Sequence, residues 1–201
     1  MRKWLWIGIV VCVGIWWLWP PRTVEIKNVK NAGYTLVAFG DSLTYGYGAA
    51  RDDSYPAVLA RSLNRPVINL GKNGETAQGA APRIAQALAE NPYMVLIEFG
   101  GNDFMKGVSF EQTLHSMEQM VDAVQAAGAV AVIVDTGGYY GMQKYSKAYK
   151  KIAREKGAVF VPGILDGIFN KSAYKADQIH PNAAGYAVVA ERVEKAIKPY
   201  L

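Results

Sequence analysis

The sequence predicts a three-layer α/β/α fold, in which a parallel β-sheet lies between two layers of helices. From residue 34 onward, short runs of apolar residues alternate with longer stretches of helical periodicity. The apolar runs are continuous, which is typical of parallel strands that helices cover on both faces. Alternation of strands and helices implies right-handed crossover connections, and these bring the strands into one sheet.

The elements follow from these runs in chain order. Five apolar runs are expected to be strands: Thr35–Phe39, Pro66–Leu70, Tyr93–Phe99, Ala129–Asp135 and Ala158–Val161. Helical stretches lie between and after them: Tyr55–Leu63, Ala77–Glu90, Ser109–Ala127, Gln143–Lys156 and Ala183–Ile197. In the third helical stretch, apolar residues recur at spacings of three and four, which gives one apolar face for the core. No internal repeat divides residues 34–201, so we expect one catalytic domain there.

The first 21 residues do not continue this pattern. Arg2 and Lys3 precede residues 4–19, an uncharged run with tryptophans at both ends, and Pro20 and Pro21 follow it. A basic start before an apolar run is typical of an export signal, and tryptophans suit the two interfaces of a membrane. The sequence predicts that residues 1–21 are an uncleaved signal-anchor, with a cleaved signal peptide as the alternative. Residues 22–33 are expected to be a tether.

This N-terminal pattern also predicts a location. The positive-inside rule places the catalytic domain outside the cytoplasm, on the periplasmic or extracellular face. We expect residues 4–19 to anchor it to the inner or plasma membrane, whereas cleavage would release a secreted protein.

Composition excludes several function classes. The formal net charge of +5 is too small to favour a nucleic-acid partner. The single cysteine, Cys12, lies in the N-terminal run, so the domain is expected to have no internal disulfide. Two histidines and no downstream cysteine do not favour a zinc site, and we expect neither metal nor cofactor.

Polar residues and glycines follow the strands where a parallel sheet binds its ligands. The segments are Gly40-Asp41-Ser42, Gly71-Lys72-Asn73-Gly74-Glu75-Thr76, Gly100-Gly101-Asn102-Asp103 and, after a longer loop, Asp177-Gln178-Ile179-His180. Ligands of open α/β sheets bind beyond the carboxyl ends of the strands. The first three segments are therefore expected to lie together, and the fourth can reach them.

Ser42, His180 and Asp177 have the residue types of a catalytic triad. A serine hydroxyl is a weak nucleophile until a base removes its proton, and His180 is the candidate base. An aspartate three residues earlier can hold one ring nitrogen and leave the other free. Plainer roles are also open: Ser42 as a helix N-cap, Asp177 as a turn residue and Asp41 as a residue that orders its turn.

The four segments, in this order, resemble the four blocks of the SGNH (GDSL) hydrolase superfamily, and the bacterial thioesterase I/lysophospholipase/arylesterase type most closely. The resemblance covers nearly all of residues 34–201. It implies a flavodoxin-like, five-stranded parallel sheet and a catalytic triad of Ser42, Asp177 and His180. It also implies an oxyanion hole made by the backbone N–H groups of Ser42 and Gly74 and the side-chain amide of Asn102.

The resemblance further implies a serine esterase that hydrolyses acyl esters, thioesters or lysophospholipids through an acyl-enzyme. A carbohydrate O-deacetylase or acyltransferase with the same triad is the alternative. Residues that flank the four segments are candidates for substrate binding: Phe104, Met105, Tyr139, Tyr140 and the segment Ile164–Phe169. Their apolar character favours an acyl chain or an aromatic ester over a sugar.

Overall fold

The computed structural model describes residues 24–137 and 141–201. The predicted signal-anchor, the start of the tether, and Tyr139 and Tyr140 lie outside the described residues. Among the described residues, no helix has the length and apolar character needed to cross a membrane.

Five parallel strands form the sheet, which confirms the predicted fold class. The strands are β1 (Leu36–Gly40), β2 (Val67–Asn69), β3 (Met94–Glu98), β4 (Val130–Val134) and β5 (Val159–Val161). Their order is β2-β1-β3-β4-β5, and each neighbouring pair is parallel. The chain moves outward in opposite directions from the β1–β3 pair, so the crevice at the carboxyl end of this pair is where such a sheet binds ligands.

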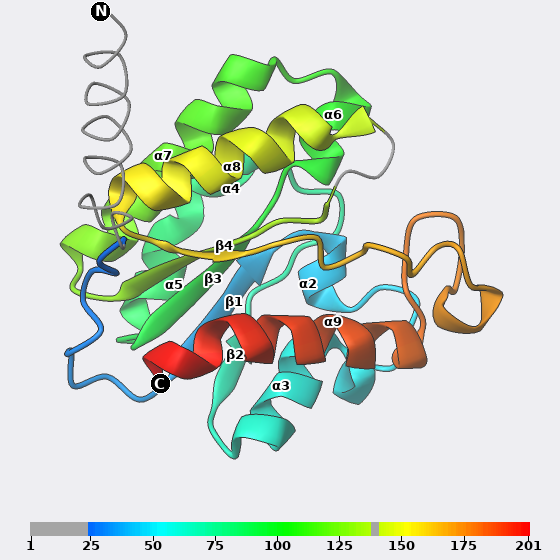
Figure 1. Ribbon diagram of the computed structural model, residues 1–201, viewed down its shortest axis with the longest axis horizontal. Helices are drawn as coiled ribbons and strands as arrows, with labels where there is room; N and C mark the ends of the chain where they lie inside the picture. The colour runs from blue at the N-terminus through cyan, green and yellow to red at the C-terminus, as the bar shows by residue number, and fades with distance from the viewer. Residues whose placement is uncertain (1–23, 138–140) are drawn as a thin grey trace, which may run out of the picture.

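Helices cover both faces of the sheet (Figure 1). On one face lie α3 (Tyr55–Leu63) and α9 (Ala183–Ile197), and on the other lie α7 (Phe110–Ala126) and α8 (Gln143–Lys156). Side chains of β1 alternate between two cores because successive strand residues point to opposite faces. Leu36 and Ala38 pack in the α3–α9 core, whereas Val37 and Phe39 pack in the α7–α8 core.

Four short helices differ from the predicted elements. The expected helix Ala77–Glu90 is divided into α4 (Ala77–Ala80), a 3-10 turn and α5 (Ile84–Ala89). Pro82 lies in that turn, and proline has no N–H for a continuous helix. Two segments expected to be loops are helical, α2 (Ser42–Tyr45) and α6 (Gly101–Lys106).

The described part of the predicted tether packs against the domain instead of hanging free. The Lys27 N–H donates to Gly157 O just before β5, and Asn28 donates to Ala129 O just before β4. Asn31 donates to Tyr93 O just before β3. This segment therefore crosses the amino ends of three strands.

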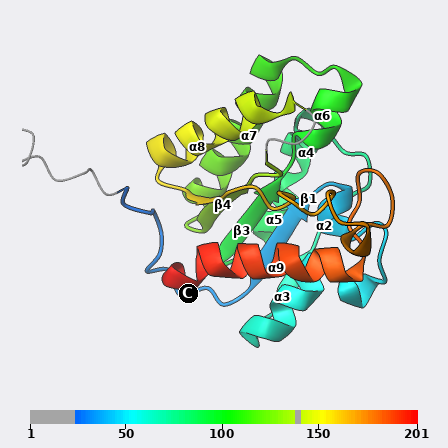
Figure 2. The ribbon, with the colours of Figure 1, turned by 45° about the vertical axis from the view of Figure 1, so that its right-hand side comes forward.

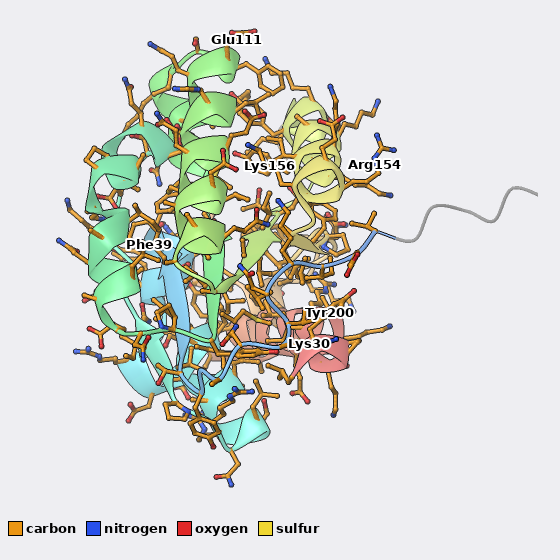
Figure 3. The ribbon with its side chains drawn as sticks, turned by 90° about the vertical axis from the view of Figure 1, so that its left-hand side faces the viewer. Lys30, Phe39, Glu111, Arg154, Lys156 and Tyr200 are labelled. Carbon is orange, nitrogen blue, oxygen red and sulfur yellow. The ribbon has the colours of Figure 1, made fainter. Side chains whose placement is uncertain are left out.

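The first described residues and the loops of the candidate site lie at opposite edges of the sheet. Figure 2 shows the dark blue N-terminal segment on the side away from α2 and from the loop that precedes α9. Figure 3 shows Arg154 and Lys156 of α8 beside this segment, and both residues line a surface hollow with Val24 and Lys27.

Candidate active site

Ser42 is the first residue of α2, directly after the turn that leaves β1. Asp41 is the N-cap of this helix, and its Oδ1 accepts the Leu43 N–H at 2.9 Å. Gly40 permits the sharp turn, because a Cβ there would lie 2.1 Å from Thr44 Oγ1. The strand end thus fixes Ser42 at the carboxyl edge of the sheet. The predicted turn-ordering role of Asp41 agrees with this contact.

His180 reaches Ser42 from the loop before α9. Its Nε2 lies 3.0 Å from Ser42 Oγ, and its Nδ1 lies 2.8 Å from Asp177 Oδ2. The imidazole is mostly buried, with 13% of the side chain exposed, and the ring of Tyr47 packs against it at 4.6 Å between centroids. The structure therefore brings the three predicted triad residues into one hydrogen-bonded line.

Asp177 is held by its own loop. Its Oδ1 accepts the N–H groups of Ile179 and His180, both at 2.8 Å. Its limited burial favours a higher pKa, but the His180 ring and these N–H groups lower the pKa of Asp177 below its ordinary value. The carboxylate is therefore charged at neutral pH, and it favours the tautomer with the proton on Nδ1. Nε2 is then free to accept the Ser42 proton.

Asn102 is buried in α6, next to the end of β1. Its Nδ2 donates to Asp41 Oδ2 at 2.8 Å, which uses one amide hydrogen and leaves the other for a second acceptor. Sequence reasoning missed this contact. The signal available was the position of Asp41 and Asn102 just beyond the ends of what would be neighbouring strands.

Gly74 lies in the loop after β2 with φ of +71°, a conformation that favours glycine. Its carbonyl accepts Lys106 Nζ of α6 at 2.5 Å, so the two loops are joined. Within the described residues, the backbone N–H groups of Ser42 and Gly74 donate to no protein group. Both are thus available as donors.

An apolar cavity of about 460 Å³ opens beside Ser42. Its lining is Ser42, Leu43, Gly101, Phe104, Met105, Thr136, Met142, Leu165, Phe169, Gln178 and Ile179. Phe104 and Met105, two of the candidates for substrate binding, line it, and from the candidate segment Ile164–Phe169 two residues, Leu165 and Phe169, also line it. Met142, which precedes α8, was not predicted as part of the site, and no motif in the sequence marks it.

Comparison with known proteins finds relatives that match most of the domain. A model of the GDSL-like Lipase/Acylhydrolase family matches residues 38–188. "Thioesterase 1/protease 1/lysophospholipase L1" of Escherichia coli strain K12 is 29% identical over 177 residues, 84% of this chain and 85% of the relative. An arylesterase of Vibrio mimicus is 27% identical over 189 residues, 88% of this chain and 94% of the relative.

The solved structures agree with the sequence comparisons. The crystal structure of a protein named TesA matches with a TM-score of 0.77 and 29% identity. The match covers 83% of this chain and 99% of the TesA chain.

Proposed function

We propose a mechanism and a substrate class for this chain, which belongs to the GDSL-like lipase/acylhydrolase family and is a carboxylic ester hydrolase. The proposed reaction is the hydrolysis of acyl esters or thioesters through an acyl-enzyme on Ser42. The observation that carries the proposal is the 3.0 Å contact of Ser42 Oγ with His180 Nε2 in the wall of an apolar cavity.

In the first half of the reaction, Ser42 Oγ attacks the acyl carbonyl carbon. His180 Nε2 takes the hydroxyl proton, and the Asp177 carboxylate stabilises the imidazolium that results. The carbonyl π electrons move to oxygen and give a tetrahedral oxyanion. When this intermediate collapses, the bond to the leaving group breaks and His180 returns the proton to the departing oxygen or sulfur.

Three neutral donors are proposed to bind the oxyanion. They are the backbone N–H groups of Ser42 and Gly74 and the free amide hydrogen of Asn102. Donors that are held in place before the reaction need no reorganisation when charge develops. Each donor therefore lowers the activation barrier by about 3 kcal/mol. In the second half, water loses a proton to His180 and attacks the acyl carbonyl carbon. When the resulting tetrahedral intermediate collapses, the bond from the acyl carbon to Ser42 Oγ breaks, His180 returns the proton to Ser42 Oγ, and the carboxylic acid is released.

The apolar cavity is proposed to hold the acyl group. Seven of its lining side chains are aliphatic, aromatic or thioether groups: Leu43, Phe104, Met105, Met142, Leu165, Phe169 and Ile179. Each methylene buried there contributes about 0.8 kcal/mol, so kcat/KM should rise about fourfold per methylene until the cavity is filled. The names of the relatives, which include thioesterase, lysophospholipase and arylesterase, support an acyl substrate of this kind.

The test uses p-nitrophenyl esters from acetyl to palmitoyl. Ser42→Ala should lower kcat at least ~1,000-fold, whereas the matched control Ser62→Ala on α3 should keep full activity. Mass spectrometry of quenched reactions should find the acyl mass on the Ser42 peptide. Activity retained by Ser42→Ala would refute the mechanism. A preference for acetyl esters, with acetate released from polysaccharide, would favour the deacetylase alternative.

We also propose, from the sequence alone, that residues 4–19 hold the enzyme at a membrane on its exported side. The alternative remains a secreted enzyme released by cleavage of the signal.

A further inference from the structure

Two carboxyl groups lie buried beside the turn that carries Ser42. Glu98 ends β3 and is 0% exposed, and Asp41 follows β1 and is 2% exposed. Gly40 of β1 lies opposite Glu98 in the register of these neighbouring strands. Within the described part of the chain, no lysine or arginine forms an ion pair with either group. Since a second uncompensated buried charge is costly, we expect one carboxyl of the pair to be neutral.

The hydrogen bonds around Glu98 leave one of its oxygens unsatisfied. Thr44 Oγ1 donates to Oε2 at 3.1 Å, and the Tyr55 hydroxyl lies 3.1 Å from the same Thr44 oxygen. Oε1 is buried and accepts no hydrogen bond from any residue that the structure describes. The Asp41 carboxyl lies beside Glu98, near enough for its charge and for a side-chain hydrogen bond to act on Glu98. Two carboxyls can form such a bond only when one of them carries a proton.

Glu98 is the better holder of that proton. Asp41 accepts two N–H donors, from Leu43 at 2.9 Å and from Asn102 at 2.8 Å, and these stabilise its negative charge. Glu98 accepts the Thr44 hydroxyl, and the backbone N–H of Asp41 has a smaller stabilising effect on its charge. Burial, followed by the neighbouring Asp41 charge, raises the pKa of Glu98 well above its ordinary range. Burial also raises the pKa of Asp41, to about 6, although its hydrogen bonds lower it.

The other titratable groups around the Glu98–Asp41 pair do not remove the need for a proton on one of the two carboxyls. Tyr55 of α3, Tyr149 of α8 and Tyr186 of α9 face it, and burial raises the pKa of each above its ordinary value, so all three are neutral. The remaining group is His180, whose charge favours the ionised form of Asp41.

We propose that Glu98 is a positioning residue for the oxyanion hole: its carboxylic acid donates a hydrogen bond to Asp41, which in turn fixes the amide of Asn102. The path runs from Tyr55 through Thr44 and Glu98 to Asp41 and Asn102, and every link is between buried groups. Glu98 itself does not touch the substrate. Glu98 affects the orientation of the free Asn102 hydrogen. Because that hydrogen is proposed to bind the oxyanion of the transition state, a change at Glu98 should alter kcat. This inference rests on the function proposed above and deepens it.

The test compares two substitutions of Glu98 in the full chain. Glu98→Gln keeps an N–H donor for Asp41 and an oxygen acceptor for Thr44, so its kcat should stay within about threefold of the parent. Glu98→Leu has similar size and neither group, and its kcat should fall on the order of tenfold to a hundredfold with little change in KM. In an Asn102→Ala background, Glu98→Leu should cause no further loss, because it acts through that amide.

Three results would overturn the proposal. They are a folded Glu98→Gln protein as impaired as Glu98→Leu, a fully active Glu98→Leu protein, and losses of Glu98→Leu and Asn102→Ala that multiply. If Glu98→Leu does not fold, infrared spectroscopy decides. The parent at pH 8 should have a carboxylic-acid C=O band that Glu98→Gln lacks, and absence of the band from the parent would overturn the proposal.

Ser42→Ala separates this inference from the proposed function. Activity retained by Ser42→Ala would refute the proposed mechanism whatever the Glu98 variants do. With Ser42→Ala inactive, the comparison of Gln with Leu at position 98 tests the positioning role alone.

Discussion

The acidic residues around Ser42 differ in burial, and their protonation differs with it. Asp177 is 45% exposed at the side chain, and hydrogen bonds hold its pKa low. Asp41 and Glu98 are buried, and burial raises the pKa of both. In the proposed mechanism, the imidazolium of His180 would therefore lie beside a charged partner, Asp177. The proposed oxyanion would accept hydrogen bonds from neutral donors, because the Asp41 carboxylate is already paired with the Asn102 amide.

Asn102→Ala tests the oxyanion hole directly. The substitution removes one donor and leaves Asp41 without its amide partner, so kcat should fall by about 100- to 1,000-fold with little change in KM. Steady-state kinetics with a p-nitrophenyl ester measure this. Asn73→Ala, an exposed asparagine beside Gly74, is the matched control and should be fully active. A kcat of Asn102→Ala within threefold of the parent would contradict the assignment.

Glu98→Gln should change how stability depends on pH. A carboxyl whose folded pKa lies above its ordinary value of 4.5 stabilises the fold fully below pH 4.5, and this contribution is lost as the pH rises toward the folded pKa. Glutamine does not titrate. The free energy of unfolding of Glu98→Gln minus that of the parent should therefore grow with pH above 4.5, by up to ~1.4 kcal/mol per pH unit.

Urea denaturation between pH 4.5 and 8 measures this difference. Glu90→Gln, which replaces an exposed carboxyl, is the matched control for the change of residue type. A difference for Glu98→Gln that stays constant across the pH range would show that Glu98 does not hold a proton in the folded state.

At the level of elements, the site depends on close packing of two loops. Gly48 follows α2 with φ of +93°, and a Cβ there would lie 2.7 Å from Ala176 Cβ and 2.8 Å from Pro181 O. Both contacts belong to the loop that carries His180. The Tyr186 hydroxyl of α9 also donates to Tyr47 O at 2.8 Å, which holds the two loops together. The glycine thus sets how near His180 can come to Ser42.

Gly48→Ala should move the His180 loop outward and lower kcat on the order of a hundredfold, because a displacement of about 1 Å is enough for such a loss. Ester kinetics and urea denaturation should be measured together. Gly128→Ala is the matched control: it has a similar positive φ of +81° and open space around the new Cβ. It should lose stability and keep kcat. Equal kcat values for both variants would refute the role of loop packing.

The sequence predicted elements well where the pattern was long and continuous. Tyr55–Leu63, Gln143–Lys156 and Ala183–Ile197 are helices with the expected bounds. Helices α2 and α6 were missed because they are short and begin in glycine-rich segments, where local propensity does not favour a helix. Pro82 is the residue in the sequence that marks the break between α4 and α5.

Some features of the site could also be predicted from the sequence, and others could not. Ser42 could be named because it directly follows a predicted strand, and His180 because it follows Asp177 by three residues in a chain with two histidines. The role of Asn102 was named from the resemblance to the SGNH hydrolases. The Asp41–Asn102 bond and the Met142 wall of the cavity could not be predicted. They depend on strand register and on the path of a loop, and neither leaves a periodic signal in one sequence.

For the whole molecule, the two edges of the sheet have different roles. The carboxyl edge carries the site, and the amino edge is crossed by the first described residues, through Asn28 and Asn31. A five-residue strand spans about 17 Å, so the site lies at least that far from the edge where Val24 enters the fold. An anchor that precedes Val24 would therefore attach on the side away from the cavity.

The last prediction concerns attachment of the enzyme to a membrane through residues 4–19. If residues 4–19 stay in the membrane, the full chain should sediment with membranes, resist a high-salt wash and be released by detergent. Mass spectrometry should find the peptide of residues 4–19 in the pellet. Ile9→Arg with Val13→Arg places two charges in the apolar run, at a cost of about 3 kcal/mol each, and should move the enzyme out of the pellet. Lys171→Ala with Lys175→Ala, two exposed residues of the catalytic domain, is the control and should stay with the membranes. An exported, soluble enzyme that lacks the peptide would instead establish cleavage.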